Sequence, residues 1–140
     1  MSQQEIKIDW LGKMAFKAGV NGHEIILDAV PGVGGENRGP RPKPLAMIAL
    51  AGCTGMDVVS ILRKMKVEPD SFSVKVVGDL TEEHPMRYTA MHVIYEFRGK
   101  ELPMEKLEKA VSLSEERYCG ISATYKKAMA ITSEIRILED

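Results

Sequence analysis

The longest apolar stretch of the chain, residues 44–66, predicts a buried helix. Its sequence PLAMIALAGCTGMDVVSILRKMK is apolar on nearly every side when successive residues are placed about 100° apart. A helix of this kind is covered by surrounding structure rather than lying on a surface. One narrow polar strip runs along it, formed by Cys53, Asp57, Ser60 and Lys64. The strip makes Cys53 a candidate site residue; the alternative is a packed core cysteine, since free cysteines are among the most buried residues.

Alternating polar and apolar residues before this helix predict three strands. Residues 5–10 alternate as a half-buried strand does, residues 14–18 pair back on them, and residues 24–28 follow. Asn21-Gly22 is a strong hairpin signal, because both positions accept a positive φ. The chain is therefore expected to open with an antiparallel meander.

Residues 30–44, between the third strand and the helix, are rich in Gly and Pro and predict a segment without regular structure. The charged residues Glu36, Arg38 and Arg41 lie where this segment could fold over the start of the helix. A Gly-rich loop before a helix also occurs in phosphate-binding sites, but the Lys-Ser/Thr signature of such loops is missing. A flexible lid or connection is favoured.

After the helix, residues 72–77 and 87–97 alternate as strands, residues 103–118 predict an amphipathic helix, and residues 129–135 predict a closing strand. Cys119 falls at the end of the second helix. Strands and helices do not alternate regularly, as they would in a parallel doubly wound sheet. The pattern predicts an α+β fold.

Composition narrows the class of protein. A chain of 140 residues that is 44% hydrophobic fits one domain, residues 1–140. The net charge of −1 and the scattered basic residues indicate no nucleic-acid or membrane partner. The N-terminus carries no export signal, and the longest apolar run contains Asp57 and is expected to be too short to span a bilayer. A cytoplasmic protein is expected, in which cysteines are free, metal-bound or redox-active.

A helix that is apolar all round needs cover on every side. One amphipathic helix and one sheet face would cover about half of it. A second copy of the same helix would supply the rest, because a two-fold interface is self-complementary. A homodimer is therefore expected. No zinc site is expected, since His23, His84 and His92 lack ligand spacing.

Three features together resemble the OsmC/Ohr family of thiol-dependent hydroperoxide reductases. They are the Pro-rich entry into ALAGCTGMDVVSIL, the second helix ending in SEERYCGISAT, and the order of strands and helices around them. The resemblance spans essentially the whole chain and is closest to a less-studied branch of the family. It implies an OsmC-like fold in which antiparallel sheets pack on a long central helix and a second amphipathic helix. It also implies an intertwined homodimer with active sites at the subunit interface.

The resemblance implies roles for both cysteines, which are 66 positions apart (119 − 53). Cys53 corresponds to the thiol that attacks the peroxide, and Cys119 to the thiol that resolves the sulfenic acid as a disulfide. An external dithiol, rather than a bound cofactor, would restore both thiols. An apolar pocket walled by Met47, Leu50 and Met56 would favour alkyl hydroperoxides over hydrogen peroxide.

Cys53 needs a positive neighbour if it is to attack as a thiolate. Apolar surroundings and Asp57, four residues later, both raise a thiol pKa. In the best-studied members of the family an Arg offsets such effects. Arg38 and Arg41 are the available cations in the preceding loop, and Glu36 could orient one of them.

The sequence departs from the family pattern at two places. The Glu that holds the Arg in well-studied members, ten residues before the reactive cysteine, is Lys43 here. The Pro-Val that often follows the second cysteine is Gly120-Ile121. At a helix C-terminus, Cys119 would feel the negative end of the dipole, which suits a resolving thiol. The alternative function is a non-catalytic dimer that binds a small lipophilic ligand or senses thiol oxidation.

Overall fold

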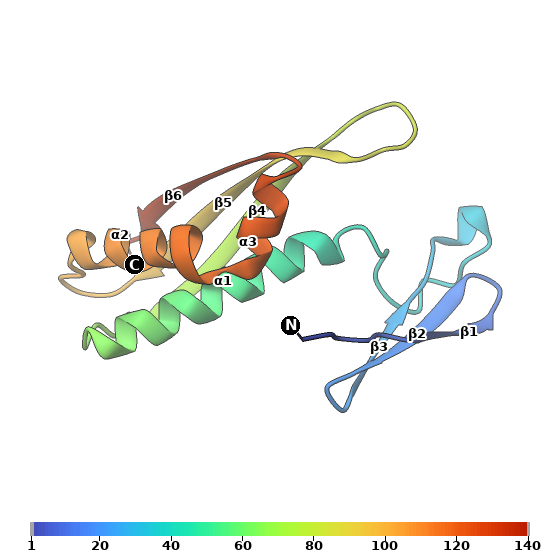
Figure 1. Cartoon of the computed structure of the whole chain (residues 1–140), viewed down its shortest axis with the longest axis horizontal. Coiled ribbons are helices and arrows are strands. Elements are labelled where there is room, and N and C mark those ends of the chain that lie inside the picture. The colour runs from blue at the N-terminus through green and yellow to red at the C-terminus, as the bar shows by residue number, and fades with distance from the viewer. Residues whose placement is uncertain (1, 140) are drawn as a thin grey trace. The chain divides into compact units, whose positions relative to one another are not determined.

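A computed structural model describes residues 2–139 of the chain (Figure 1). The chain divides into two compact units, with the boundary between Ala46 and Met47. Each unit contains one three-stranded sheet. The α+β class is confirmed, and the assignment of residues 1–140 to one domain stays a prediction.

Unit 1 contains the predicted antiparallel meander. Its strands are β1 (Ile8–Gly12), β2 (Ala15–Val20) and β3 (His23–Leu27), paired in that order. The turn between β2 and β3 uses the expected pair, with a φ of 51° at Asn21 and 80° at Gly22. The hairpin prediction is therefore confirmed.

The prediction that the first strand is half-buried is wrong for the single chain. Ile8 and Trp10 are 47% and 67% exposed. Within residues 2–44, only the short 3₁₀ turn η1 (Pro31–Val33) accompanies this sheet. A three-stranded layer without a second layer of its own leaves its apolar side chains in solvent.

Asp28, at the end of β3, organises the loop that leads to the central helix. Its side chain is 4% exposed and accepts hydrogen bonds from the backbone N–H groups of Ala29 (2.7 Å), Glu36 (3.2 Å) and Arg38 (3.1 Å). Its own N–H donates to the carbonyl oxygen of Pro40 (3.2 Å). The segment is irregular, as predicted, but it is fixed to the end of β3 rather than built as a free lid.

Two glycines allow this loop to lie against the preceding chain. A Cβ added at Gly35 would lie 2.0 Å from the carbonyl oxygen of Ala29. At Gly39 it would lie 1.9 Å from that of Ile26. No side chain fits at either distance, so part of the loop's glycine content follows from close packing.

Acid is expected to loosen this loop. Burial opposes ionisation of Asp28, but the three N–H donors outweigh it and lower the pKa of this carboxyl below 3.8. The carboxylate therefore stabilises the loop above pH 3.8, and this contribution is lost as the pH falls through the lower, folded-state pKa. NMR should show the amide protons of Glu36 and Arg38 moving toward random-coil shifts in that range. In Asp28→Asn the shifts should be altered but independent of acid; wild-type shifts that stay constant would contradict the expectation.

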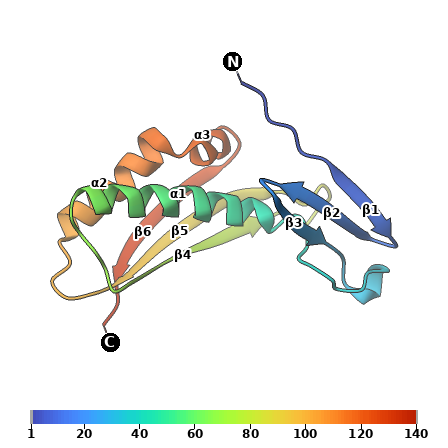
Figure 2. The ribbon, with the colours of Figure 1, turned by 90° about the horizontal axis from the view of Figure 1, so that it is seen from below.

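Unit 2 contains the second sheet and almost all of the helical structure. Its elements are α1 (Leu45–Lys64, which begins at the unit boundary), β4 (Ser71–Leu80), β5 (Tyr88–Arg98), α2 (Met104–Leu113), the π-helical turn η2 (Ser114–Tyr118), α3 (Gly120–Lys126) and β6 (Ala130–Ile137). The sheet order is β4-β5-β6, and the three helices lie on one side of it (Figure 2).

The expectation of antiparallel sheets is wrong for one pair of strands. β4 and β5 pair antiparallel, but β5 and β6 pair parallel. The chain from β5 passes through α2, η2 and α3 before β6, and a crossover of this length returns it to the starting end of the sheet.

The central helix α1 is buried on one face only. Its inner row is Leu50, Thr54, Val58 and Leu62, spaced four residues apart. The facing row of β5 is Met91, Val93, Tyr95 and Phe97, each at most 1% exposed. On the other side of α1, Ile48 and Met56 are 60% and 77% exposed. The prediction that this helix is buried on every side is therefore wrong for a single chain.

The expectation that the apolar run is too short for a bilayer is also wrong. The 20 residues of α1 are long and apolar enough to cross a membrane, by length and composition alone. The central helix of a soluble protein's core passes the same test.

The second predicted helix changes from an α-helix to a π-helical turn after Leu113. Its buried positions are Leu107, Ala110, Val111 and, on the π-helical turn, Ser114. Met104 and Tyr118, which were expected in the apolar stripe, are 39% and 55% exposed. The i→i+5 spacing of a π turn breaks the α-helical period, so the extrapolated stripe fails at Tyr118. Met104 precedes this turn and is the first residue of α2.

Candidate active site

The structure brings Cys53, Asp57 and Cys119 together within unit 2. Their two sulfurs and one carboxylate oxygen all lie within 4.8 Å of one another. Cys53 and Asp57 are half-buried on neighbouring turns of α1, where residues four apart share a face. Cys119 is 3% exposed, and both cysteines are free thiols. Two thiols that are distant in sequence therefore meet at one place.

Cys119 lies at the end of the π-helical turn that continues α2, as expected, and also at the start of a further helix, α3, which was not expected. Its N–H donates to the carbonyl oxygen of Ser114 (2.7 Å) and closes the π-helical turn. Cys119 is then the N-cap of α3, and its sulfur accepts the N–H of Ser122 (3.3 Å). The π turn and the cap together hold the sulfur in place.

The Cys119 thiol is strongly disposed to stay protonated. Burial, followed by the neighbouring Cys53, raises the pKa of Cys119 to about 11, and the N–H of Ser122 offsets this only in part. The predicted resistance to ionisation is thus found, but its cause is burial rather than a helix C-terminus. A protonated thiol in this position must lose its proton before it attacks another sulfur.

A chain of buried hydroxyl groups continues from Asp57 into the core. Ser114 Oγ lies 2.9 Å from Asp57 Oδ2 and 2.8 Å from Thr54 Oγ1. Thr54 Oγ1 lies 2.8 Å from the hydroxyl of Tyr95, which donates to Glu115 Oε2 at 2.9 Å. The site residues predicted from the sequence did not include Thr54, Ser114, Tyr95 or Glu115. The available signal was Thr54, the one hydroxyl in the otherwise apolar inner row of α1.

The environment of Tyr95 keeps its hydroxyl protonated. The side chain is fully buried, and burial raises its pKa well above the ordinary value. The negative charge of Glu115 and its hydrogen bond raise it further, against the opposing hydrogen bond from Thr54. Tyr95 is therefore a hydrogen-bond donor rather than a phenolate.

The predicted supporting cations belong to the loop of unit 1. The backbone of Arg38 is held by Asp28, and the guanidinium of Arg41 donates to Asn37 Oδ1. Glu36, expected to orient an arginine, pairs with Lys13 at 3.6 Å in an exposed ion pair. The cysteines lie in unit 2, and the role of either arginine beside Cys53 stays a prediction.

The three predicted pocket residues do not share a face of α1. Leu50 is 1% exposed, Met47 is half-buried, and Met56 is 77% exposed. Of the three, only Met56 lines a described hollow, a groove of about 490 Å³ along the exposed side of α1. Its other lining residues are Gly52, Gly55, Val59, Ser60, Arg63 and Phe72.

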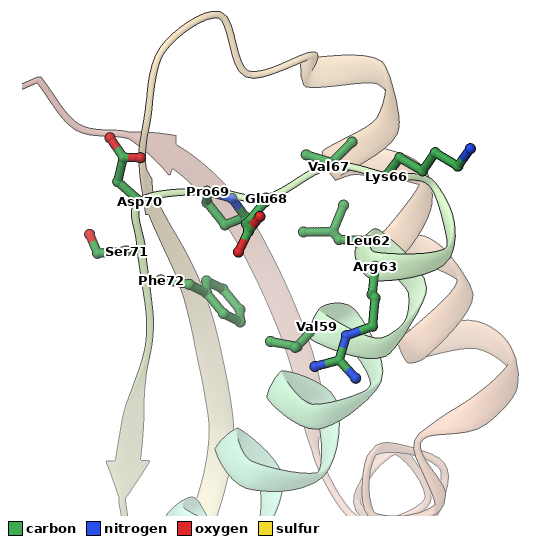
Figure 3. A pocket seen from close by; sticks show the side chains of 10 residues that line it. All are labelled: Val59, Leu62, Arg63, Lys66, Val67, Glu68, Pro69, Asp70, Ser71 and Phe72. Atoms are coloured by element: carbon green, nitrogen blue, oxygen red, sulfur yellow. The ribbon is translucent and has the colours of Figure 1, made fainter.

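A second hollow, of about 620 Å³, continues this groove at the C-terminal end of α1 (Figure 3). Val59, Leu62 and Phe72 form apolar walls, and Lys66 points away from the cavity. Among the described residues its lining includes neither a cysteine nor a histidine. Because its walls are apolar, this hollow belongs to the uncovered side of α1 and is not a candidate active site.

The cysteine site also has the donor atoms of a metal site. Two sulfurs and a carboxylate oxygen within 4.8 Å form a set that Zn²⁺ accepts. This set of donors includes none of the three histidines, which were expected to lack the spacing of zinc ligands. Cys53, Asp57 and Cys119 are therefore the residues that could hold such an ion.

The sequence and the fold of this chain are similar to those of a known protein family. The sequence profile of OsmC-like proteins matches residues 34–134. Protein YhfA of Escherichia coli is 28% identical over 135 residues, which are 96% of this chain and 98% of YhfA. A hypothetical protein from Aquifex aeolicus has a crystal structure that is similar over the whole chain and 99% of its own length, with a TM-score of 0.85 and 26% identity.

More distant structures share the fold. The organic hydroperoxide resistance protein OhrB of Bacillus subtilis matches with a TM-score of 0.63 and 17% identity, over 95% of this chain and 98% of OhrB. The family includes hydroperoxide-reducing peroxidases, and its members are typically dimers. Since the profile match spans more than half of the sequence and the fold agrees, the chain belongs to the OsmC-like protein family.

Proposed function

We propose that the protein reduces organic hydroperoxides, with Cys53 as the attacking thiol and Cys119 as the resolving thiol. The observation that supports this most is the meeting of the two sulfurs within 4.8 Å, although the residues are 66 positions apart (119 − 53). The high pKa of Cys119 supports the division of roles, because a thiol that stays protonated is a poor first nucleophile.

The reaction has two steps at these sulfurs. The Cys53 thiolate attacks the O–O bond, gives two electrons to the peroxide and becomes a sulfenic acid, while the alkoxide leaves and takes up a proton to form the alcohol. The Cys119 sulfur then attacks the sulfenic sulfur, forming the disulfide and releasing water. An external small dithiol reduces the disulfide by exchange and completes the cycle.

Activation of the Cys53 thiol and assembly of a homodimer both contribute to this function. Arg38 or Arg41 supplies the positive charge that favours the Cys53 thiolate. The protein works as a homodimer, in which a second copy covers the exposed apolar side of α1 at Ile48, Met56 and Val59. The part of the apolar groove that stays open beside the second copy favours alkyl hydroperoxides.

Oxidation of the reduced protein by cumene hydroperoxide tests the function. Thiols are counted by mass spectrometry during a titration with one equivalent of peroxide per chain. We expect fast loss of two thiols, one alcohol per chain and a single Cys53–Cys119 disulfide. Hydrogen peroxide at the same concentration is expected to react more slowly, because it gains nothing from an apolar groove.

A slow reaction would refute the proposed hydroperoxide-reducing activity. If the thiols are oxidised no faster than free cysteine, the result favours the alternative function, a non-catalytic dimer that binds a small lipophilic ligand or senses thiol oxidation. If two thiols are lost quickly but the disulfide joins two chains, the assignment of Cys119 as the resolving thiol is wrong.

A further inference from the structure

Cys53, Asp57 and Cys119 bring three ligand atoms together from two separate elements. Cys53 and Asp57 belong to α1, Cys119 is the N-cap of α3, and the two sulfurs and one carboxylate oxygen lie within 4.8 Å of one another. Ligand atoms on one tetrahedral Zn²⁺ are about 3.5–3.8 Å apart, because Zn–S bonds are about 2.3 Å and Zn–O bonds about 2.0 Å long. Side-chain movements of about 1 Å therefore close this set around a single ion.

Hydrogen bonds from one buried residue fix two of these ligands relative to each other. Ser114 donates from its Oγ to Asp57 Oδ2 (2.9 Å), and its carbonyl oxygen accepts the N–H of Cys119 (2.7 Å). Ser114 is fully buried, so it is held firmly in the core. Metal ligands in proteins are oriented by outer contacts of this kind. The cluster therefore has the supporting contacts of a metal site as well as its donor atoms.

A buried hydroxyl without a partner borders the cluster. Ser122 is 1% exposed, and its Oγ has no hydrogen-bond partner within the described residues 2–139. Its own N–H donates to the Cys119 sulfur at 3.3 Å, which places this residue beside that ligand. Buried hydroxyl groups are nearly always satisfied. Three protein ligands leave the fourth position of a tetrahedral ion to water, and a bound water is the kind of partner that Ser122 lacks.

The types of donor atom select the ion. Thiolates bind Zn²⁺ and Cu⁺ strongly, whereas Mg²⁺ and Ca²⁺ prefer sites built from oxygen alone. The carboxylate favours Zn²⁺ over Cu⁺, because oxygen is a hard ligand. A divalent ion also suits the charge of the cluster, since the three side chains include no cation. Such an ion deprotonates a coordinating thiol outright.

We propose that the reduced protein binds one Zn²⁺ per chain at Cys53, Asp57 and Cys119, and that oxidation of the two thiols excludes the ion. The binding site is independent of the proposed function, and only the exclusion of the ion by peroxide rests on it. A sulfur that shares its electron pair with a metal is a weaker nucleophile, so bound Zn²⁺ protects both thiols from oxidants. The site therefore exists in two exclusive forms, a zinc-bound dithiolate and a metal-free disulfide.

Conversion of the first form into the second balances in atoms and electrons. Zn²⁺ leaves to solvent, and the two sulfurs that held it take up two protons. The hydroperoxide then takes two electrons from these sulfurs, its O–O bond breaks and the S–S bond forms, and the two protons complete one alcohol and one water. The disulfide has no thiolate to offer, so the ion cannot return. An external dithiol reduces the disulfide and restores both ligands.

Metal titration of the reduced protein, without peroxide, tests the site. Protein treated with a chelator is titrated with Zn²⁺ in a calorimeter and with Co²⁺ in a spectrophotometer. We expect one ion per chain, thiolate-to-cobalt charge-transfer absorption and the visible bands of a tetrahedral site. Cys119→Ser should weaken Zn²⁺ binding about 100-fold or more, and Asp57→Asn about tenfold or more. Asp79→Asn removes an exposed carboxylate of β4 and should bind as wild type does.

Thermal unfolding separates loss of the site from loss of the fold. Each variant is melted without metal to check that it is folded and then melted with Zn²⁺. The ion should raise the Tm of wild type and of Asp79→Asn, because it binds the folded chain, and should leave the Tm of Cys119→Ser nearly unchanged. A reduced wild type that binds no Zn²⁺, or a Cys119→Ser protein that binds it equally well, would overturn the metal site even if peroxide is reduced quickly.

Oxidation of the zinc-loaded protein tests the competition. One equivalent of cumene hydroperoxide should release one Zn²⁺ per chain, detected by a zinc-sensitive dye, together with the loss of two thiols. The zinc-loaded thiols should be oxidised about tenfold or more slowly than those of metal-free protein. Equal rates with and without Zn²⁺ would overturn the protection. Tight Zn²⁺ binding by a protein whose metal-free thiols react no faster than free cysteine would overturn the proposed function and leave the metal site standing.

Discussion

Cys53→Ser is expected to abolish the fast oxidation of the protein by cumene hydroperoxide, lowering the rate by about 10³-fold or more. The remaining Cys119 is buried, and its pKa of about 11 leaves little thiolate at neutral pH. Stopped-flow measurement of peroxide consumption, with thiols counted at the end, checks this. Fast oxidation of the Cys53→Ser protein would show that Cys119 is the attacking residue.

Cys119→Ser is the matched variant, with a different expected product. Its Cys53 should still react at close to the wild-type rate in the first turnover, since the attacking thiol is unchanged. Without the second sulfur the reaction should stop at a sulfenic acid, which dimedone traps, and a second equivalent of peroxide should produce the sulfinic acid. Loss of the first turnover in this variant would contradict the assigned roles.

Met56→Glu is expected to dissociate the dimer with little effect on the fold of the chain. Met56 is 77% exposed in the single chain, on the side of α1 that lacks cover. A carboxylate buried there without a partner would cost several kcal/mol, enough to raise the dimer dissociation constant by roughly 10³-fold. Analytical ultracentrifugation over a range of protein concentrations measures the change.

Two further variants separate assembly from folding. Lys109→Glu also introduces a carboxylate, with a larger charge change of −2 instead of −1, on the exposed side of α2 and should leave the dimer intact. Leu50→Ala empties a fully buried position on the inner side of α1 and should lower the free energy of unfolding by about 2–5 kcal/mol. A Met56→Glu protein that stays dimeric, or a wild type that is monomeric at high concentration, would place the interface elsewhere or remove it.

Most of the fold could be predicted because its signals are local. The hairpin at Asn21-Gly22 follows from backbone preferences, and α1 follows from the length of its apolar run. The parallel pairing of β6 could not be predicted from alternation, because a strand has the same side-chain period in both directions. The exposure of Ile8 and Trp10 also escaped prediction, since alternation does not reveal whether a covering layer lies in the same unit.

The site was predictable only in part. The polar strip on α1 placed Cys53 beside Asp57, and the resemblance added Cys119, which the structure brings to the same place. Thr54, Ser114 and Tyr95 were missed because each falls in a row that reads as core. Their grouping depends on contacts between three different elements, and no short stretch of sequence contains them.

The π-helical turn at Ser114–Tyr118 has a consequence for the permitted length of this segment. Deleting one residue there would let the helix continue with regular spacing, and every later side chain would turn by about 100° around the axis. Ser114 would then no longer close the turn at Cys119, and the second thiol would face away from the first. Pairing of the two sulfurs thus depends on the number of residues in this turn as much as on their identity.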